Sequence, residues 1–322
     1  MADPIRFIDA AEVRERLDHR TCIDLMRDAM IALAEGRSRQ LLRGIIDLDG
    51  GDLFGVMPGA LDGAGFGAKI ISIFPVAAAH GSSHQGVIIL FDRASGAPVC
   101  VIDASEVTAI RTAAASAAAT DALARAEARR LPILGTGEQA WHHVVAISHV
   151  RPLDEVRIWG RSPEKAKELA DRVARDSGLA AHAATSVVEA TSGTDIICTL
   201  TGAAEPILLD AQVQDGTHIN AVGSSRAGPS EIDEALVARA RFVPDHREGV
   251  LAQGAEYLRA SAAGLVAETH VLPEIGNIFS GSAQGRQSAS DVTIYKSLGS
   301  IVQDLACAGW LWKTYSDRES GT

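Results

Sequence analysis

The sequence predicts an α/β protein made of two differently built regions, and three observations lead to this prediction. A short apolar run meets a Gly-Thr-Gly turn within residues 131–137 and then enters a helical pattern. Strand-like and helical segments alternate from that turn onward. The first 105 residues instead hold short β-rich runs broken by Gly and Pro. Strands that alternate with helices form parallel sheets covered on both faces, and a chain of 322 residues is long enough for a second domain.

The first region is expected to begin with helices and to continue as a sheet. Apolar and charged residues recur at helical spacing over residues 10–36, and Gly36 is the expected stop. β-rich runs fill residues 41–75. Residues 86–105 then predict a hairpin, with two apolar strands around a Ser-Gly turn.

The Ala-rich residues 105–130 predict one long helix with Ser105 as its N-cap. The tail, residues 291–317, begins as a strand, becomes an amphipathic helix and loses the alternation, so it is expected to return to the first region. Between these two segments, strands are expected at 131–135, 155–160, 194–201, 217–223 and 240–245, and helices at 138–150 and 162–178.

Composition excludes several classes of protein. A net charge of −11 and a pI near 5.4 argue against a broad nucleic-acid surface. The four cysteines lie far apart and form no metal-ligand spacing, which indicates reduced, packed thiols. The N-terminal segment lacks a secretory pattern, and no apolar run is long enough for a membrane span. With no GxSxG motif to suggest a hydrolase, we expect a cytoplasmic protein without nucleic-acid, membrane or metal partners.

The Gly-Thr-Gly turn predicts a dinucleotide-binding site. Gly135, Gly137 and Ala140 fit the pattern G-x-G-x-x-A between a strand and a helix. The first glycine permits the tight turn, the second lets backbone approach the pyrophosphate, and the alanine permits close helix packing. A structural turn in another kind of α/β protein is the alternative.

The ribose-binding position favours NADPH. The acid expected about 20 residues after the turn is replaced by Gly160, followed by Arg161 and Ser162. A missing carboxylate removes repulsion of a 2′-phosphate, and a guanidinium group pairs with one. Alternatively, Arg161 stacks on the adenine and admits NADH as well.

Several motifs occur together in one order: the stretch from "QGVIILFDRASG" to "RTAAASA" (85–117), then "GTGEQA", "EVRIWGRSPEKA", "HINAVGSS" and "YKSLG". With them the chain resembles the ornithine cyclodeaminase/mu-crystallin family over nearly its whole length. The resemblance implies a Rossmann-type dinucleotide-binding domain, residues 114–296, inserted in an α+β substrate-binding and dimerisation domain, residues 1–113 with 297–322. It also implies a homodimer that joins sheets from two chains.

The shared chemistry of that family moves a hydride between a nicotinamide cofactor and the α-carbon of an amino or imino acid. Arg43, Lys69 and Arg111 match its three cationic substrate positions. Lys69 lies in an otherwise apolar strand, where a lysine is costly unless it is paired or lines a cavity. It is also our candidate acid, because burial among cations lowers the pKa of an ammonium group. Alternatively, all three cations form ion pairs that stabilise the domain.

The resemblance also implies further binding residues. His84, beside Gln85, is expected near the substrate, where it either donates a proton or bonds a loop carbonyl, and Thr112 resembles a residue that touches the cofactor phosphates. His142 and His143 are expected to pack rather than to bind metal. The full predicted cofactor set is Thr112, Gly135, Thr136, Gly137, Glu138, Gln139, Gly160, Arg161, Ser162, Thr199, Val222 and Ser297.

One departure from the family pattern decides between chemistries. Cyclodeaminases and a related alanine dehydrogenase carry an Asp where this chain has Ser225, which is followed by Arg226. A hydroxyl group is no general base at neutral pH without a base of its own. Ser followed by Arg is typical of the ketimine reductases in the family, so reduction of a C=N bond is favoured and Ser225 joins the catalytic set. The alternative is that Glu231 or Asp233 replaces the missing acid.

The sequence therefore predicts an NAD(P)H-dependent imine reductase that converts an α-imino carboxylate to an L-amino acid. The substrate is either cyclic, such as Δ1-pyrroline-2-carboxylate, or open-chain, such as iminosuccinate, for which Arg226 or His84 would be the extra cation. Two alternatives stay open. One is an ornithine cyclodeaminase or an alanine-type dehydrogenase, and the other is a non-catalytic protein that binds NADPH and a small ligand.

Overall fold

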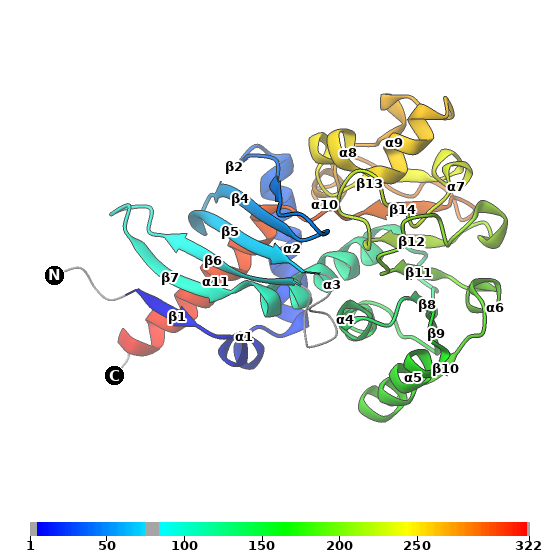
Figure 1. The fold of residues 1–322 in the computed structure, drawn as a ribbon, viewed down its shortest axis with the longest axis horizontal. Coiled ribbons are helices and arrows are strands. Elements are labelled where there is room, and N and C mark those ends of the chain that lie inside the picture. The colour runs from blue at the N-terminus through cyan, green and yellow to red at the C-terminus, as the bar shows by residue number, and fades with distance from the viewer. Residues whose placement is uncertain (1–4, 75–83, 321–322) are drawn as a thin grey trace. The chain divides into compact units, whose positions relative to one another are not determined.

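A computed structural model describes residues 5–74 and 84–320, except the side chains of residue 84 and of 317–320. The chain divides into two compact units (Figure 1). Unit 1 holds residues 1–111 and 300–322, and unit 2 holds residues 112–299. The last helix thus returns to the first unit after the chain has completed the second.

Unit 1 is built on a seven-stranded, mostly antiparallel sheet with the order β1-β7-β6-β5-β4-β2, in which β3 also pairs with β4. Only β1 runs parallel to its neighbour, β7. Lys69 stands in β5 opposite Met57 of β4 and Ile88 of β6. The strands are β1 (Arg6–Ile8), β2 (Ser38–Gln40), β3 (Gly44–Asp47), β4 (Leu53–Leu61), β5 (Gly65–Ile73), β6 (His84–Phe91) and β7 (Pro98–Asp103).

Among the described residues of unit 1, the helices α1 (Ala10–Arg16), α2 (His19–Ala34) and α11 (Ile301–Ser320) pack on or beside this sheet. The first two begin at the N-caps Asp9 and Asp18, whose carboxylates accept bonds from backbone amides of the first turn. The α11 helix packs against α2 and against β4, β5 and β6. Cys22 and Cys307, far apart in the sequence, bring their buried Sγ atoms within 3.6 Å of each other there.

The Ala-rich helix α3 (Ala104–Leu123) contains the boundary between the units. It corrects two expectations. The carboxylate of Asp103, not Ser105, accepts the bond from the Glu106 amide at 2.8 Å. The helix ends at Leu123 rather than at residue 130, because the buried Arg151 guanidinium binds the last carbonyls, those of Thr120, Asp121 and Ala124.

Unit 2 contains a seven-stranded sheet in which all neighbours are parallel, in the order β10-β9-β8-β11-β12-β14-β13. The chain moves outward from β8 through β9 to β10, then crosses back to β11 on the other side of β8. Ligands of such sheets bind at the carboxyl ends of the strands where this reversal occurs. The strands are β8 (Arg130–Leu134), β9 (Glu155–Trp159), β10 (Ala180–Ala183), β11 (Ile196–Thr199), β12 (His218–Ala221), β13 (Arg241–Pro244) and β14 (Thr293–Lys296).

The helices of unit 2 are α4 (Glu138–Ser148), α5 (Pro163–Ser177), α6 (Val187–Thr191), α7 (Glu234–Arg239), α8 (Arg247–Gln253), α9 (Ala255–Ala262) and α10 (Ile275–Phe279), with 3₁₀ turns at Asp210–Gln212 and Glu268–His270. Fully buried Leu134, Ile197, Ile219, Phe242 and Ile294 form the centre of its core. Across residues 5–74 and 84–320, no helix is both long and apolar enough to cross a membrane. The predicted fold class, a Rossmann-type unit inserted in an α+β unit, is confirmed.

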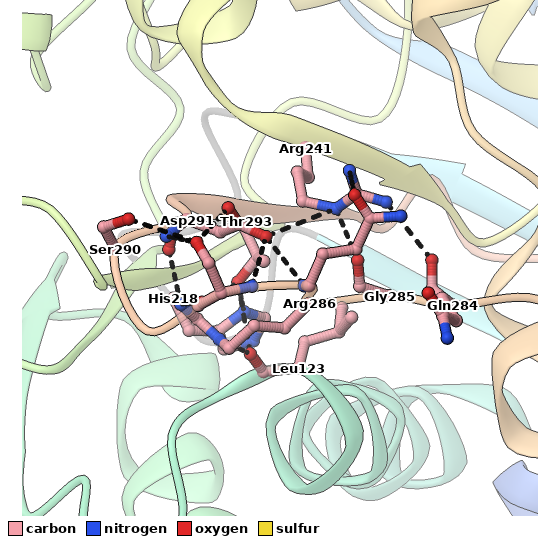
Figure 2. Close-up of polar contacts among 11 residues, drawn as sticks. Leu123, His218, Arg241, Gln284, Gly285, Arg286, Ser290, Asp291 and Thr293 are labelled. Atoms are coloured by element: carbon pink, nitrogen blue, oxygen red, sulfur yellow. Dashed lines mark hydrogen bonds and ion pairs between the residues drawn. The ribbon is translucent and has the colours of Figure 1, made fainter.

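The amino ends of β12 and β14 are held by a polar cluster, which Figure 2 shows in close-up. Arg286 donates from Nε to the carbonyl of Leu123 at 2.7 Å and from Nη2 to Thr293 Oγ1 at 3.2 Å. Arg241 donates to the carbonyls of Gly285 and Gln284. Backbone carbonyls satisfy most of these donors, so the cluster closes the loop that precedes β14 and belongs to the structure of this end of the sheet.

Candidate active site

The glycine turn after β8 has the geometry of a phosphate-binding turn. Gly135 has φ +135°, and a Cβ there would lie 2.7 Å from the carbonyl oxygen of Leu200, just beyond β11. Gly137 is the N-cap of α4, and a Cβ there would meet nothing within 4 Å. Ala140 is fully buried. The backbone therefore leaves open space at the amino end of an 11-residue helix, which attracts an anion.

A buried hydroxyl group at the same edge of the sheet also fits a cofactor. Ser297 follows β14 with 2 % of its surface exposed, and its Oγ has no hydrogen-bond partner within the part of the chain that the structure describes. Buried hydroxyl groups normally have partners, so this one is suited to a bound ligand. The predicted Thr199 is buried at the end of β11, and Val222 is half-buried after β12. The residues present thus fit a nicotinamide dinucleotide.

The predicted ribose segment follows β9. Arg161 is exposed. Ser162 caps α5 by accepting a bond from the Lys165 amide at 3.3 Å, and it donates to Glu164 Oε2 at 2.8 Å. A carboxylate bonded to Ser162 in this segment weakens the case for a bound 2′-phosphate, because like charges repel. Glu164 is thus an acidic side chain of this segment that was not among the predicted ribose-binding residues.

The loop after β12, which carries Ser225 and Arg226, is held in place by Glu231. Both carboxylate oxygens of this fully buried residue are occupied: Oε1 accepts from Thr201 N and Oγ1 at 2.6 and 2.7 Å, and Oε2 accepts from Gly223 N at 2.7 Å. A Cβ on Gly223 would lie 2.2 Å from the carbonyl oxygen of Thr201, so only glycine fits there. Burial raises the pKa of Glu231, although these bonds oppose the change.

This arrangement bears on the suggestion that Glu231 or Asp233 replaces the missing acid. Glu231 is fixed between two loops, as described. Asp233 caps α7, accepting from the amides of Leu236 at 3.0 Å and Asp210 at 3.1 Å. Both carboxylates therefore have structural tasks that a catalytic excursion would disrupt.

A second buried pair supports the same loop. Lys296, fully buried at the end of β14, forms an ion pair with Glu256 Oε2 at 2.7 Å and donates to the carbonyl of Ser224 at 2.6 Å. Asp245 accepts from the amides of Leu298 and Gly299 at 2.8 and 2.7 Å and so fixes the chain after β14. Burial raises the pKa of Asp245.

Unit 1 contains a different polar cluster, centred on Lys69. Its Nζ donates to Asp304 Oδ1 at 3.0 Å and to Thr108 Oγ1 at 2.5 Å. Arg111 Nε donates to the same Asp304 oxygen at 3.2 Å, and its Nη1 donates to Gln303 Oε1 at 2.9 Å. Lys69 and Arg111 are 3 % and 4 % exposed, and Asp304 is fully buried. Two of the predicted cations thus share one carboxylate oxygen.

The pKa values in this cluster follow from burial and from the excess of cations. Burial lowers the pKa of Lys69, Asp304 opposes that change, and Arg111 and Arg43 lower the pKa further, to about 8 from 10.5. Burial raises the pKa of Asp304, but the two cations beside it outweigh burial, so that this pKa lies below its ordinary value. A lysine with a pKa near neutrality is suited to proton donation.

The remaining predicted substrate residues differ in placement. Arg43 is half-buried just before β3, and its charge acts on Lys69. Ser225 is half-buried and Arg226 is exposed. His84 begins β6, but its side chain lies outside the described residues. His143 is fully buried on α4, where its ring nitrogens bond the Gln139 carbonyl and Ser116 Oγ at 2.8 and 2.9 Å, as expected of a packed histidine.

A hollow of about 720 Å³ lies elsewhere, at the β10 edge of the unit 2 sheet, lined partly by Arg157, His182 and Glu189. The Arg157 guanidinium is already bonded to both oxygens of Glu155 and to the carbonyls of Glu189 and Ser192. The charge of Arg157 is therefore already used within the protein.

Three residues of these clusters were not predicted from the sequence: Asp304, Lys296 and Glu256. Each had a signal, because each places a charge in or beside an apolar stretch, as in "TIYKS" and "IVQDLACAG". The signal shows that a charge is buried but not which partner it has. Only the structure identifies Asp304 as the partner of Lys69.

The sequence matches the ornithine cyclodeaminase/mu-crystallin family over residues 6–319. The chain belongs to this family. It is 34 % identical over 269 residues to a Delta(1)-pyrroline-2-carboxylate reductase of Bacillus cereus, covering 83 % of this chain and 82 % of that one. It is 37 % identical over 234 residues to the ketimine reductase mu-crystallin of Mus musculus, covering 73 % and 71 %.

Two solved structures resemble nearly the whole chain. The Delta(1)-pyrroline-2-carboxylate reductase of Thermococcus litoralis, in complex with NADH and L-proline, has a TM-score of 0.94 at 27 % identity and covers 98 % of both chains. An archaeal alanine dehydrogenase dimer with bound NAD has a TM-score of 0.92 at 26 % identity and covers 98 % of this chain. Both unit folds therefore recur in proteins that bind nicotinamide cofactors.

Proposed function

We propose that this protein is an NAD(P)H-dependent imine reductase that converts an α-imino carboxylate to an L-amino acid. The observation that carries the proposal is the buried cluster of Lys69 and Arg111 on one carboxylate oxygen, which keeps positive charge for an anionic substrate. Unit 2 is proposed as the cofactor-binding domain, since the turn at Gly135 and the hydroxyl group of Ser297 fit a dinucleotide.

The reaction adds a hydride to the α-carbon and a proton to the nitrogen of the C=N bond. Bound NAD(P)H supplies the hydride. The cations Arg43 and Arg111 bind the substrate carboxylate, and a guanidinium group suits this task because it pairs with both carboxylate oxygens. Lys69 donates the proton, since its pKa of about 8 keeps it protonated yet acidic near neutral pH.

Ser225 distinguishes reduction from deamination. Oxidative deamination needs a base to remove the amine proton, and Ser225 offers only a hydroxyl group. The two nearby acids named by the sequence argument, Glu231 and Asp233, are held by backbone amides. These contacts favour the reductase over a cyclodeaminase or an amino-acid dehydrogenase.

We propose a cyclic substrate of the Δ1-pyrroline-2-carboxylate class, because the curated bacterial relative and the Thermococcus structure both carry that name. For the cofactor we propose that NADPH is used at least as well as NADH. Arg161 supports this choice and Glu164 opposes it. The cytoplasm is the proposed location, in keeping with four free, buried cysteines.

We propose a homodimer formed through unit 1. The strand β3 is bonded to β4, and apolar side chains on and around β3 are exposed, among them Leu41 at 71 % and Ile46 at 59 %. An exposed apolar strand invites pairing with another chain. Light scattering after size-exclusion chromatography tests this: the mass of a monomer at micromolar concentration contradicts the proposal.

The decisive experiment follows NADPH and NADH oxidation at 340 nm against a panel of imines. The panel contains Δ1-pyrroline-2-carboxylate, Δ1-piperideine-2-carboxylate, and pyruvate, glyoxylate and oxaloacetate, each mixed with ammonia or methylamine. Turnover of a cyclic imine supports the proposal. If no imine of the panel is turned over and ammonia is released from ornithine or alanine in the presence of NAD⁺, the deaminating alternative replaces the proposal.

A further inference from the structure

The proposed function gives no task to the carboxylate of Asp304. This residue stands on α11, in the tail that returns to unit 1, and its surface is fully buried. Its Oδ1 accepts hydrogen bonds from Lys69 of β5 and Arg111 of α3. Its Oδ2 is buried without a hydrogen-bond partner among the described residues. Buried carboxylates are costly, so a single one between two cations calls for an explanation.

We infer that Asp304 is the positioning residue of the imine reduction, which fixes the Lys69 ammonium group and the Arg111 guanidinium group by one shared oxygen. The inference rests on the proposed function. It concerns a residue that touches neither substrate nor cofactor and acts through the two cations. Three elements distant in sequence, β5, α3 and α11, are joined at this carboxylate oxygen.

The contacts leave each cation with a donor for a ligand. An ammonium group has three N–H donors, and Lys69 uses two of them, on Asp304 and Thr108. Arg111 uses Nε on Asp304 and Nη1 on Gln303, and no bond from its Nη2 occurs among the described residues. Asp304 thus aligns both cations and leaves at least one N–H donor on each for an incoming carboxylate or imine.

The same carboxylate sets the charge of the cluster. Burial lowers the pKa of Lys69, and Asp304 is the group that opposes this change, while Arg111 and Arg43 add to it. The neighbours of Lys69 on β4 and β6, Met57 and Ile88, are apolar. On α2, burial raises the pKa of the Cys22 thiol, which therefore contributes no charge. Among the groups named here, Asp304 is the one that favours the protonated form of Lys69.

A purely structural role for Asp304, fastening α11 to the sheet, predicts different behaviour. Loss of such a fastener lowers the free energy of unfolding but leaves the pH dependence of catalysis unchanged. Loss of a positioning residue moves the pH at which Lys69 loses its proton. The pH profile therefore separates the two roles.

The test compares Asp304→Asn with Glu106→Gln. Glu106 is a matched control, because it is a buried carboxylate of unit 1 that pairs with Arg14 but does not contact Lys69. For each variant we would measure kcat/KM for Δ1-pyrroline-2-carboxylate from pH 6 to 10, the dissociation constant of the planar analogue pyrrole-2-carboxylate over the same range, and the melting temperature. In Asp304→Asn the alkaline decline is expected about one pH unit lower, with kcat/KM at pH 8 reduced about tenfold. Glu106→Gln should keep the wild-type profile.

Each outcome decides the question. If kcat/KM of Asp304→Asn declines at the same alkaline pH as kcat/KM of the wild type, the inference is overturned. Asp304 then has only the structural role of holding α11 against the sheet. If that variant does not fold, Asp304→Glu replaces it: its displaced carboxylate should lower kcat/KM about tenfold at an unchanged pH of decline, and wild-type kcat/KM would overturn the inference. If the wild-type protein reduces no imine, the proposed function fails, and analogue binding then decides. Analogue binding that weakens above pH 8 in the wild type, and at a lower pH in Asp304→Asn, supports the role of Asp304. No analogue binding, or the same pH profile of binding in both proteins, overturns it.

Discussion

In the part of the chain that the structure describes, two lysines are buried in strands, one in each unit, and their surroundings differ. Lys69 of unit 1 shares the single carboxylate of Asp304 with Arg111. Lys296 of unit 2 has the carboxylate of Glu256 as its ion-pair partner and also donates to the carbonyl of Ser224. The first arrangement has two cations for one carboxylate, whereas the second has one cation for its one ion-pair partner.

The difference teaches how to separate a ligand site from a structural ion pair. A buried cation that is balanced within the protein has no charge left for a ligand, and its removal exposes the cost of its partner. A buried excess of cations is unfavourable in the empty protein and is relieved when an anion binds. By this criterion we assign Lys69 to the proposed substrate site, whereas Lys296 supports the loop that carries Ser225.

The largest expected effect comes from Lys69→Ala. It should lower kcat/KM for the imine about 10³-fold, because both the proton donor and a substrate cation are lost. The protein should still fold, since Arg111 keeps Asp304 paired. Steady-state kinetics and NADPH titration measure the two effects, with Lys167→Ala, an exposed lysine, as control. Catalysis within a few-fold of wild type would make Lys69 structural and undo the comparison.

Lys296→Met should act on stability instead. It leaves Glu256 buried without its cation, at a cost of about 3–5 kcal/mol in the free energy of unfolding. Urea denaturation monitored by circular dichroism measures this loss. The double variant with Glu256→Leu should recover most of it, because no uncompensated charge remains. A single variant as stable as wild type would show that the pair is dispensable.

The pH dependence of the wild-type enzyme sharpens the comparison further. The pKa of Lys69 is lowered to about 8, so Lys69 loses its proton at a lower pH than an exposed lysine does. A neutral amine neither donates the proton nor attracts the carboxylate, so kcat/KM should fall above pH 8, about tenfold per pH unit. A profile that is flat to pH 10 would contradict both roles of Lys69.

The smallest expected effect concerns the cofactor. Arg161→Asp should shift the NADPH to NADH ratio of kcat/KM toward NADH, about tenfold, by replacing a partner of the 2′-phosphate with a repelling charge. Glu164→Gln should shift the ratio the other way, because it removes the carboxylate next to Ser162. Coupled measurements with both cofactors give the ratios, and an unchanged ratio in Arg161→Asp would remove that residue from the ribose site.

Local patterns predicted the elements well where neighbouring residues alone decide them. The glycine turn between β8 and α4 and the helix expected at 162–178, observed as α5, follow from residue types and spacing. The predicted end of α3 at residue 130 was wrong. Arg151, which lies after β8 and α4 in the sequence, binds the carbonyls at the end of the helix. Glu231, suggested as an alternative catalytic acid, joins two loops by accepting hydrogen bonds from their backbone amides. These loops come together only in the folded sheet.

The sequence by itself determined the fold class, the dinucleotide turn and the family, because these depend on periodicity, glycine positions and ordered motifs. It also showed that Lys69 places a charge in an apolar strand, and Lys296 carries the same kind of signal although it was not predicted. Only the tertiary structure decided which carboxylate each lysine meets, because Asp304 lies 235 residues from Lys69 along the chain. Electrostatic energy depends on distance in space and on burial, and neither is written in the local pattern.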